Sequence, residues 1–298
     1  MRNGSPQTTP PHVREPLPTC VQDLPALPPE YRTALAEGLA TISLAGGAGD
    51  AQPAGTHSAD VQPTCTRPGD ARPLGAVLSA AQLDVIADHV RLLLAWNEAI
   101  NLTAIRSPEM IAVEHVLDSL TALPILSRAG VDEFLDLGSG GGFPGLPLAV
   151  ALPARRALLV ESVGKKARFL ATVIEATSLQ DRVAVAATRI ETLAADPHHR
   201  GRWPAVTVRA VAQLSELVEL ALPLLRIGGI LVAWKRRPAE DEIAAADGAI
   251  RQLRGRLVRL QPIAVPGLED HVLVVVEKAG ETPPQFPRDP AARRRHPL

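Results

Sequence analysis

The feature that most constrains this chain is an alternation of short apolar runs with amphipathic stretches beyond Val131. Five such runs read EFLDL from Glu133, ALLVE from Ala157, VAVAA from Val183, AVTVRA from Ala205 and GILVAW from Gly229. Strands that alternate with helices form parallel sheets, because each crossover helix packs back on one face of the sheet. We therefore predict an α/β fold with a doubly wound, parallel sheet.

Two more strands are expected near the end of the chain. The residues from Arg256 to Pro262 form a weak strand pattern, and HVLVVVEK from His271 forms a strong one. No clear helical pattern lies between them, so we expect an antiparallel hairpin as the last part of the sheet.

Helical patterns precede the sheet. Ser79 is the expected N-cap of a long helix, and a second helix is expected over about Pro108 to Leu123. The apolar stripe of the first helix consists of Leu83, Ile86, Val90 and Leu94, and it continues to Asn97 on the same face. On the second helix the buried stripe is Val113, Leu117 and Leu120, and the opposite face carries His115, Asp118 and Ser119.

Composition divides the chain of 298 residues into two parts. Residues 1–75 are rich in Pro, Ala, Gly and Thr, and we expect them to be mostly disordered because little apolar surface can offset the ordering entropy. One short amphipathic helix is expected near 28–43, with Tyr31, Leu35, Leu39 and Ile42 on one face. Residues 76–298 are expected to form one domain, with N-terminal helices over 76–128, a core over 129–279 and a basic tail over 280–298.

Charge and hydropathy give the expected environment. The net charge of -1 marks no global attraction to nucleic acid or membranes, so any basic surface must be local. The basic tail contains Arg288, Arg293, Arg294 and Arg295, and a frayed tail that only aids solubility is an equal alternative to a binding role. The N-terminus lacks the apolar run of a signal peptide, and we expect a cytoplasmic monomer with no membrane or metal partner.

A glycine-rich stretch, DLGSGGGFPG from Asp136 to Gly145, follows the first core strand. Its glycines let the backbone approach a ligand closely before a helix begins, as in nucleotide-type sites. A dinucleotide fingerprint needs a third glycine at position 143, where this chain has Phe143, so NAD is disfavoured. An ordinary tight turn does not need four glycines in five positions.

Further candidate residues follow the next two strands. Glu161 ends the second core strand, where a carboxylate accepts hydrogen bonds from ribose hydroxyls in dinucleotide-binding folds. The third strand leads into Thr188, Arg189, Ile190 and Glu191, which are expected on the adenine side of the pocket. Capping of a helix by Thr188 is an equal alternative for that residue.

Cations end the fourth and fifth strands. Arg209 lies in the crevice where open α/β sheets bind ligands, and a guanidinium there needs an anionic or carbonyl partner. Lys235 leads into Arg236 and Arg237, a cluster that is able to bind phosphate oxygens. A solvated strand end is the alternative for this cluster.

Several linked motifs resemble one family. The chain is similar to the RsmG-type, or GidB-type, ribosomal RNA methyltransferases in WNEAINLTAI from Trp96, HVLDSL from His115, the glycine-rich stretch and ESVGKKARFL from Glu161. The likeness covers roughly Ser79 to Leu298 and continues in TRIE from Thr188, VRAVAQL from Val208, GGILVAWK from Gly228, FPRDP from Phe286 and the final HPL.

This resemblance implies a class I S-adenosylmethionine-dependent methyltransferase, with a Rossmann-like seven-stranded sheet, a C-terminal antiparallel hairpin and an N-terminal helical segment. It implies S-adenosylmethionine as donor and N7 of a guanine in 16S rRNA of the small ribosomal subunit as acceptor. The implied cofactor residues are Asp136, Gly138, Ser139, Gly140, Gly142, Phe143, Glu161, Thr188, Arg189, Ile190, Glu191 and Arg209. The residues implied on the catalytic, guanine and RNA side are Asn97, Asn101, His115, Asp118, Arg209 and Lys235.

The chain departs from the family in two places. The family commonly has Gly after the lysine that matches Lys235, whereas this chain has Arg236, which puts the shape of the local loop in doubt. An insertion near 45–75 separates the short N-terminal helix from Ser79.

Two absences narrow the acceptor of a methyl group. Both cysteines, Cys20 and Cys65, lie in the first quarter of the chain, which disfavours methylation of pyrimidine carbon 5 through a cysteine adduct. No Asn or Asp followed by two prolines comes after Arg209, as it usually does in enzymes that methylate exocyclic amines. Guanine N7 carries an in-plane lone pair and no proton, so its methylation requires positioning and electrostatics but no general base.

Recognition of the acceptor follows the same geometry. The N7 edge must face the methyl group, so Arg209 is expected to contact O6 or a phosphate rather than both O6 and N7. The target base is expected in a single-stranded loop, bound with a steep salt dependence. Two alternatives stay open: a methyltransferase for another RNA or a small molecule, favoured by the near-neutral net charge, and a module that binds the cofactor without turnover.

Overall fold

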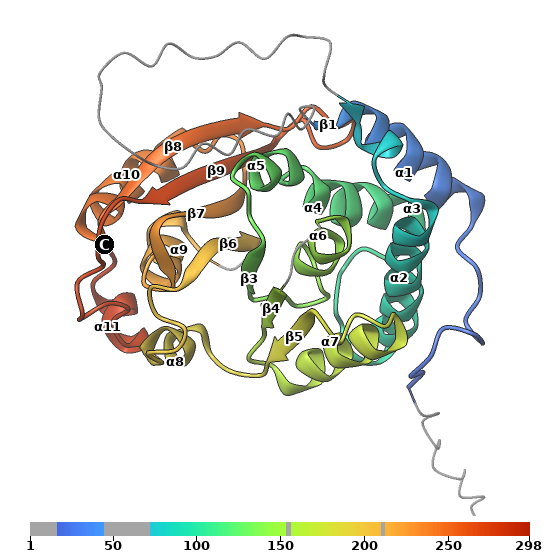
Figure 1. Ribbon diagram of the computed structural model, residues 1–298, viewed down its shortest axis with the longest axis horizontal. Coiled ribbons are helices and arrows are strands. Elements are labelled where there is room, and N and C mark those ends of the chain that lie inside the picture. The colour runs from blue at the N-terminus through green and yellow to red at the C-terminus, as the bar shows by residue number, and fades with distance from the viewer. Residues whose placement is uncertain (1–16, 45–71, 153–155, 210–211) are drawn as a thin grey trace, which may run out of the picture.

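A computed structural model describes residues 17–44, 72–152, 156–209 and 212–298. Its centre is a seven-stranded sheet in the order β5-β4-β3-β6-β7-β9-β8 (Figure 1). The strands are β3 (Glu133–Leu137), β4 (Arg156–Val160), β5 (Val183–Ala186), β6 (Trp203–Arg209), β7 (Leu225–Arg236), β8 (Gly255–Pro262) and β9 (His271–Lys278). The first five are mutually parallel, and β9 is antiparallel to both β7 and β8. The predicted class I, Rossmann-like architecture with a C-terminal hairpin is confirmed.

Helices cover both faces of this sheet (Figure 1). One layer contains α2 (Ala80–Ile100), α6 (Gly145–Ala151) and α7 (Gly164–Ala176), and the other contains α8 (Ile190–Ala195), α9 (Leu214–Ala221) and α10 (Glu240–Gln252). Successive residues of one strand enter different cores: Phe134 belongs to the first buried cluster and Leu135 to the second. This period of two explains why the strands are apolar at nearly every position.

The N-terminal segment is more ordered than the composition indicated. Helix α1 (Pro29–Thr41) agrees with the helix predicted near 28–43, and its predicted apolar side chains, Tyr31, Leu35, Leu39 and Ile42, are all buried. Residues 17–28 lie along α2, where Trp96 Nε1 donates to the Pro18 carbonyl at 2.8 Å. The expectation of disorder is therefore wrong for residues 17–44, because one apolar helix face anchors the segment. Residues 1–16 and 45–71, with Cys65, lie outside the described residues.

Short elements connect α1 to the main domain. A two-residue pairing joins β1 (Ser43–Leu44) to β2 (Arg72–Pro73), and one turn of 3-10 helix, η1 (Leu74–Ala76), follows. The predicted N-cap of α2 is confirmed: the Ser79 hydroxyl accepts from the Gln82 amide at 3.2 Å, and the Gln82 side chain accepts from the Ser79 amide at 2.9 Å. This capping box satisfies two amides that would otherwise lack partners.

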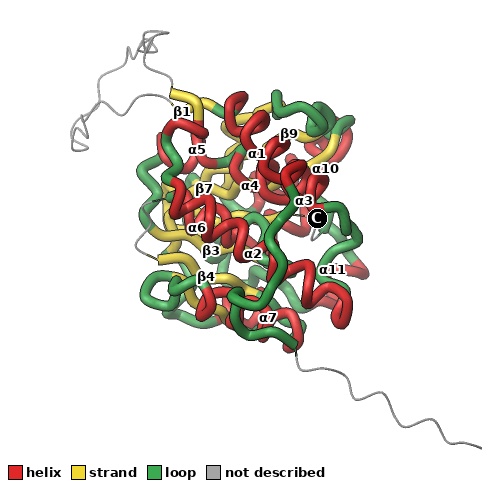
Figure 2. Tube along the Cα trace, turned by 90° about the vertical axis from the view of Figure 1, so that its right-hand side faces the viewer, coloured by secondary structure: helices red, strands yellow, loops and turns green. Residues whose placement is uncertain are grey.

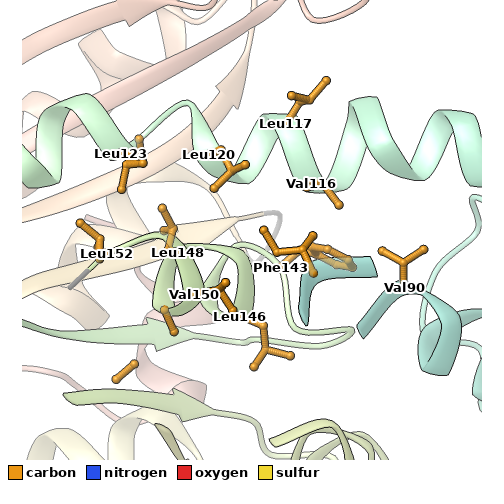
Figure 3. Close-up of a cluster of buried hydrophobic side chains, with 14 of the residues drawn as sticks. Val90, Val116, Leu117, Leu120, Leu123, Phe143, Leu146, Leu148, Val150 and Leu152 are labelled. Atoms are coloured by element: carbon orange, nitrogen blue, oxygen red, sulfur yellow. The ribbon is translucent and has the colours of Figure 1, made fainter. Parts of the chain in front are cut away.

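The second predicted helix is interrupted. It consists of α3 (Pro108–Ile111), a π-helical turn η2 (Ala112–Leu117), α4 (Asp118–Leu120) and, after Thr121 and Ala122, α5 (Leu123–Arg128). Leu117, Leu120 and Leu123 pack over α6, as Figure 3 shows. The run Pro108–Arg128 is long and apolar enough to cross a membrane by composition, but 56% of its most apolar window is buried inside this fold. Figure 2 shows the helical layer in front of the strands.

The C-terminal tail is folded rather than frayed. Asp289 caps the short helix α11 (Pro290–Arg295) by accepting from the amides of Ala291 and Ala292. Arg288 forms an ion pair of 2.6 Å with Glu219, whose carboxylate is buried.

Candidate active site

The glycine-rich turn leaves β3 with backbone angles that suit glycine. Gly138 and Gly140 have φ of 69° and 54°, which side chains adopt only with strain. The amides of Gly138 and Ser139 donate to the Val160 carbonyl at 2.8 and 3.1 Å, which holds the turn against β4. Above Gly140 the space is open: an added Cβ would meet only the Gly138 carbonyl, at 3.7 Å. The turn is therefore a cradle that offers backbone to a ligand.

Gly142, the next residue of the predicted cofactor set, is packed inward. With φ of 91°, an added Cβ would lie 2.5 Å from Leu146 Cδ1 and 2.8 Å from His89 Nε2. A larger residue here would displace Leu146 and His89 and would hold a strained φ, so Gly142 favours close packing of the turn on α6 and α2.

Asp136 and Ser139 support the turn from below. Both are buried, Asp136 completely, and Asp136 Oδ1 accepts from Thr207 Oγ1 at 2.8 Å. The Ser139 hydroxyl donates to the Asp136 carbonyl at 3.0 Å. Burial raises the pKa of Asp136 to about 6, despite the hydrogen bonds that lower it. Asp136 exposes no atom to a ligand, so we assign it a supporting role in place of the direct cofactor contact expected from the sequence.

Glu161 links β4 to the turn. Its Oε2 accepts from the Gly140 amide at 2.9 Å and its Oε1 from the Val163 amide at 2.7 Å. The carboxylate therefore lies beside the glycine turn, where the sequence predicted a ribose acceptor, and two backbone amides fix its orientation.

The predicted adenine side surrounds a cavity of about 220 Å³. Its lining includes Gly138, Ser162, Thr188, Arg189, Ile190, Glu191 and Arg293. Arg189, not Thr188, is the N-cap residue of α8, and it makes no side-chain capping bond. The capping alternative for Thr188 is therefore wrong, and Thr188 lines the cavity instead.

Phe143 forms the centre of an aromatic stack on the other side of the turn. Its ring centroid lies 4.6 Å from that of His89 and 4.8 Å from that of His115, and Arg209 Cζ lies 5.7 Å from it. Burial lowers the pKa of His89 to about 4, so this imidazole is neutral at pH 7, and its Nε2 lies 2.8 Å from the Gly141 carbonyl. Phe143 thus joins the glycine turn to the catalytic residues predicted on η2 and β6.

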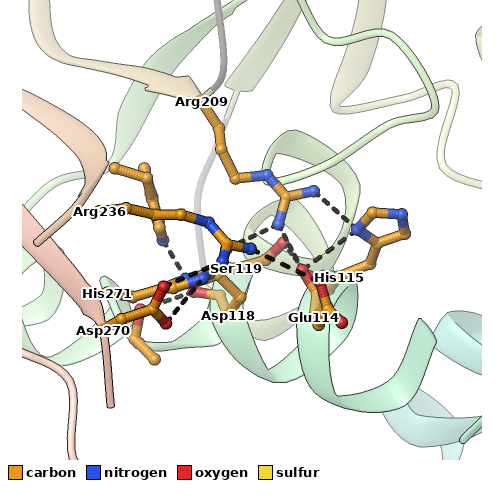
Figure 4. A network of polar contacts seen from close by, with 10 residues as sticks. Glu114, His115, Asp118, Ser119, Arg209, Arg236, Asp270 and His271 are labelled. Atoms are coloured by element: carbon orange, nitrogen blue, oxygen red, sulfur yellow. Dashed lines mark hydrogen bonds and ion pairs between the residues drawn. The ribbon is translucent and has the colours of Figure 1, made fainter. Parts of the chain in front are cut away.

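Arg209, at the end of β6, is held by the π-helical turn and α4 (Figure 4). Its Nη1 donates to Asp118 Oδ2 at 2.7 Å and to the Glu114 carbonyl at 2.9 Å. That carbonyl is accessible because the Asp118 amide bonds to the carbonyls of Val113 and His115 rather than to that of Glu114. π-Helical turns are common at functional sites for this kind of reason.

Asp118 connects strands β6, β7 and β9 to helix α4. Its side chain is 1% exposed, and besides Arg209 it binds His271 Nδ1, which donates to Oδ1 at 2.8 Å. Trp234 Nε1 of β7 donates to the Asp118 carbonyl at 2.9 Å. The sequence expectation that Asp118 and Ser119 face away from the buried stripe is wrong, since both are buried. The π-helical turn rotates them toward the sheet.

His115 is neutral and has partners on both ring nitrogens. Burial, and then the Arg209 charge, lower its pKa to about 4. Its Nε2 lies 2.7 Å from Thr103 Oγ1, and its Nδ1 lies 3.1 Å from the Glu114 carbonyl and 3.3 Å from Arg209 Nη2. With a pKa of about 4, the ring is a weak base at neutral pH.

A second cavity, of about 490 Å³, opens beside these groups. This volume lies in the range of about 300–1,000 Å³ that is typical of small-ligand pockets. The lining residues are Thr103, Ala104, Ile105, Glu114, His115, Asp118, Arg209, Trp234, Lys235, Arg236 and His271. We refer to it as the acceptor cavity.

The two cations on β7 differ in their freedom. Lys235 Nζ donates to Glu242 Oε1 at 2.6 Å and to the Ala212 carbonyl at 2.7 Å, so its charge is largely committed within the fold. Arg236 has a side chain that is 62% exposed and pairs with Asp270 at 2.9 Å and with Glu114 at 3.6 Å. Arg236 is therefore better placed than Lys235 to meet a phosphate.

Two predicted residues lie outside the acceptor cavity. Asn97 is buried, and its Oδ1 accepts from the Leu102 and Thr103 amides at 2.6 and 2.9 Å. Asn101 is exposed and ends α2 with φ of 50°. Asn97 therefore shapes the loop that brings Thr103 to His115, instead of meeting a base itself.

His271 was missed by the sequence analysis. It is the first residue of β9 and lies opposite Arg236 of β7 in the antiparallel register. The expected hairpin paired HVLVVVEK only with Arg256–Pro262, so the sequence did not indicate the antiparallel pairing with β7 that brings His271 to the ligand end of the sheet.

The arrangement fits S-adenosylmethionine. The glycine turn and Glu161 are able to hold its ribose and amino-acid part, and the cavity beside Thr188–Glu191 is able to hold its adenine. The acceptor cavity begins on the far side of Phe143 and Arg209. Among the described residues, no group of three or more His, Cys, Asp or Glu side chains is arranged to hold a metal ion.

Comparison with known proteins gives a matching family model and relatives of the same description. The family model GidB, described as rRNA small subunit methyltransferase G, matches residues 82–265. Ribosomal RNA small subunit methyltransferase G of Roseiflexus sp. (strain RS-1) is 42% identical over 228 residues, 76% of this chain and 97% of that protein. The protein of the same name from Chloroflexus aggregans is 44% identical over 224 residues, 75% of this chain and 93% of that protein. Among solved structures, an O-methyltransferase from Bacillus cereus in complex with SAH is 19% identical, covers 67% of this chain and 92% of its own, and has a TM-score of 0.47.

Proposed function

Because this chain belongs to the rRNA small subunit methyltransferase G family, we propose that it methylates N7 of a guanine in 16S rRNA. The chain is an S-adenosylmethionine-dependent rRNA methyltransferase, and the proposal specifies the atom and the residues that act on it. The observation that carries it is the position of Arg209, which lies beside Phe143 of the glycine turn and also lines the acceptor cavity.

Chemistry at this site requires no base. S-Adenosylmethionine, when bound, supplies a methyl group on a positively charged sulfur. Both His115 nitrogens have partners, and both Asp118 oxygens are engaged by Arg209 and His271. The described residues of the cavity therefore position the acceptor, which suits guanine N7 because this atom loses no proton.

Arg209 is the central positioning group for the acceptor. Its guanidinium uses one nitrogen for Asp118 and Glu114, and it has further N–H donors that are able to meet guanine O6 or a phosphate. Apolar walls from Ile105, Ala104 and Trp234 suit the faces of an unstacked base. Asn101 and Lys235 stay proposed contacts to RNA at the edge of this surface.

The proposal also concerns the state of the enzyme. It places the enzyme in the cytoplasm, where the small ribosomal subunit is assembled. We also propose that the enzyme acts as a monomer.

The test combines cofactor binding with methyl transfer. Arg209→Ala is compared with wild type and with Arg251→Ala, which removes a 73% exposed arginine from α10. We expect SAH affinity to stay nearly unchanged in both variants, and kcat for methylation of 16S rRNA to fall about 100-fold in Arg209→Ala alone. Equal losses of SAH affinity and kcat would contradict the role of Arg209.

The acceptor atom is identified separately. 16S rRNA from cells lacking this gene is incubated with labelled donor and the enzyme, and the modified nucleoside is identified by mass spectrometry. N7-methylguanosine is the expected product. Labelling of a small-molecule pool or of another RNA in its place would support the alternative acceptors, and SAH binding without any transfer would indicate a binding module.

A further inference from the structure

The C-terminal arm, residues 287–298, docks beside the predicted adenine side of the cofactor site. Its anchor is Arg288, which grips Glu219 of α9 with two nitrogens, Nε at 2.9 Å from Oε1 and Nη2 at 2.6 Å from Oε2. The Arg288 amide also donates to Glu219 Oε1, at 2.8 Å. A bidentate ion pair with a buried carboxylate fixes the arm in one orientation.

Arg293 carries the arm to the cofactor cavity. Its side chain is only 6% exposed, and its Nη2 donates to Glu191. Its Nε lies 3.3 Å from Glu216 Oε1, and its Nη1 donates to the Arg288 carbonyl at 2.7 Å. Arg293 lines the same cavity of about 220 Å³ as Gly138, Thr188 and Glu191. The neighbouring Arg294 and Arg295 are exposed.

This contact changes the chemistry of Glu191. Partial burial raises the pKa of the Glu191 carboxyl, but hydrogen bonds to Arg293 and to its own backbone amide, with the charges of Arg293 and Arg189, together outweigh that effect, and the pKa lies below its usual range. An ionised carboxylate in this cavity accepts hydrogen bonds but donates none. The matching feature of adenine is its exocyclic amino group, which donates.

We propose that Arg293 is a positioning residue of the cofactor site and orients Glu191 to accept a hydrogen bond from the adenine amino group. The C-terminal arm thereby completes the adenine side of the pocket, although Arg293 lies 102 positions after Glu191 in the sequence. This inference rests on the proposed S-adenosylmethionine site and goes beyond it by assigning the basic tail a task.

The experiment measures two ligands on three full-length proteins by calorimetry. The ligands are SAH and its analogue with hydrogen in place of the adenine amino group, and the proteins are wild type, Arg293→Ala and the exposed control Arg294→Ala. We expect wild type to bind SAH about tenfold more tightly than the analogue, the value of one hydrogen bond to a charged group. Arg293→Ala should lose this preference yet bind the analogue as wild type does, and Arg294→Ala should keep the preference.

Three results would overturn the inference. An unchanged preference in Arg293→Ala means that Glu191 does not depend on Arg293, and equal weakening of both ligands means that the arm only stabilises the pocket. If wild type itself does not bind SAH, the proposed cofactor site is wrong, and this inference fails with it. If Arg293→Ala does not fold, Arg293→Lys replaces it: it keeps the charge but lacks the planar fork, and a reduced preference is again the supporting result.

Discussion

Asp118→Asn tests whether a buried carboxylate organises the acceptor cavity. The substitution keeps the shape of the side chain and removes the negative charge that holds Arg209 at 2.7 Å and His271 at 2.8 Å. Arg209 is left partly buried, with its side chain 14% exposed, and its remaining partners are the Glu114 carbonyl and, at 3.3 Å, His115 Nδ1.

The expected loss follows from this burial. Removing one partner of a buried ion pair costs about 3–5 kcal/mol of unfolding free energy, since an uncompensated charge remains. Because Arg209 keeps the bond to Glu114, we expect the lower end, about 3 kcal/mol. The matched control is Asp270→Asn, which breaks the pair with Arg236 at 2.9 Å, where both side chains are about half exposed or more (49% and 62%). Exposed pairs contribute about 0.2–1 kcal/mol.

Urea unfolding followed by circular dichroism measures both variants, and single-turnover methylation of 16S rRNA measures the effect on catalysis. Asp118→Asn should lower the unfolding midpoint far more than Asp270→Asn and should slow methyl transfer. A difference between the two variants of less than about 1 kcal/mol would refute the assignment of Asp118 as the organising group, given the ranges for buried and exposed pairs.

Three further predictions follow from burial, backbone geometry and charge. Because the pKa of His115 is lowered to about 4 from 6.5, the unfolded state takes up its proton first, so this residue contributes stability that is lost as pH falls from 6.5 to 4. His115→Gln should flatten the measured pH dependence of unfolding in this window, and an unchanged slope would contradict the assigned burial. Gly142→Ala should lower the urea midpoint more than Gly140→Ala, because the new Cβ would lie within 3 Å of Leu146 and His89. In Gly140→Ala the new Cβ has open space, so the expected cost is about 1–2 kcal/mol for the positive φ alone. Equal midpoints for the two variants would contradict this prediction. Arg236→Ala should reduce the slope of log affinity for RNA against log salt concentration by about 1, whereas Arg251→Ala leaves it unchanged.

The strands of the core could be predicted because both faces of the sheet are buried. For example, β3 has the same bounds, Glu133 and Leu137, in the sequence prediction and in the structure. Its apolar run can be recognised without knowing which strands pair with it. The same reasoning found Glu161 and Arg209, since the carboxyl ends of parallel strands meet at one edge.

The errors concern features set by tertiary contacts. A regular helical repeat placed Asp118 on a polar face, but the π-helical turn before it depends on packing and carries no periodic signal. Asn97 was predicted on the guanine side of the site, whereas its side-chain amide donates a hydrogen bond to the Thr103 carbonyl in the loop after α2. Arg293 was one of several tail arginines, and only the position of Glu191 in space distinguishes it from Arg294.

The π-helical turn at Ala112–Leu117 has a consequence for how this site responds to mutation. Its contribution to Arg209 is a backbone carbonyl, that of Glu114, so replacement of the Glu114 side chain leaves the acceptor atom in place. An alanine at this position would therefore remove the ion pair of Glu114 with Arg236 but not the bond to Arg209. Deletion of one residue from the turn would restore a continuous α-helix, in which each carbonyl accepts from the amide four residues later, so the carbonyl that binds Arg209 would be taken up within the helix. For this segment, length constrains the site more strongly than residue identity does.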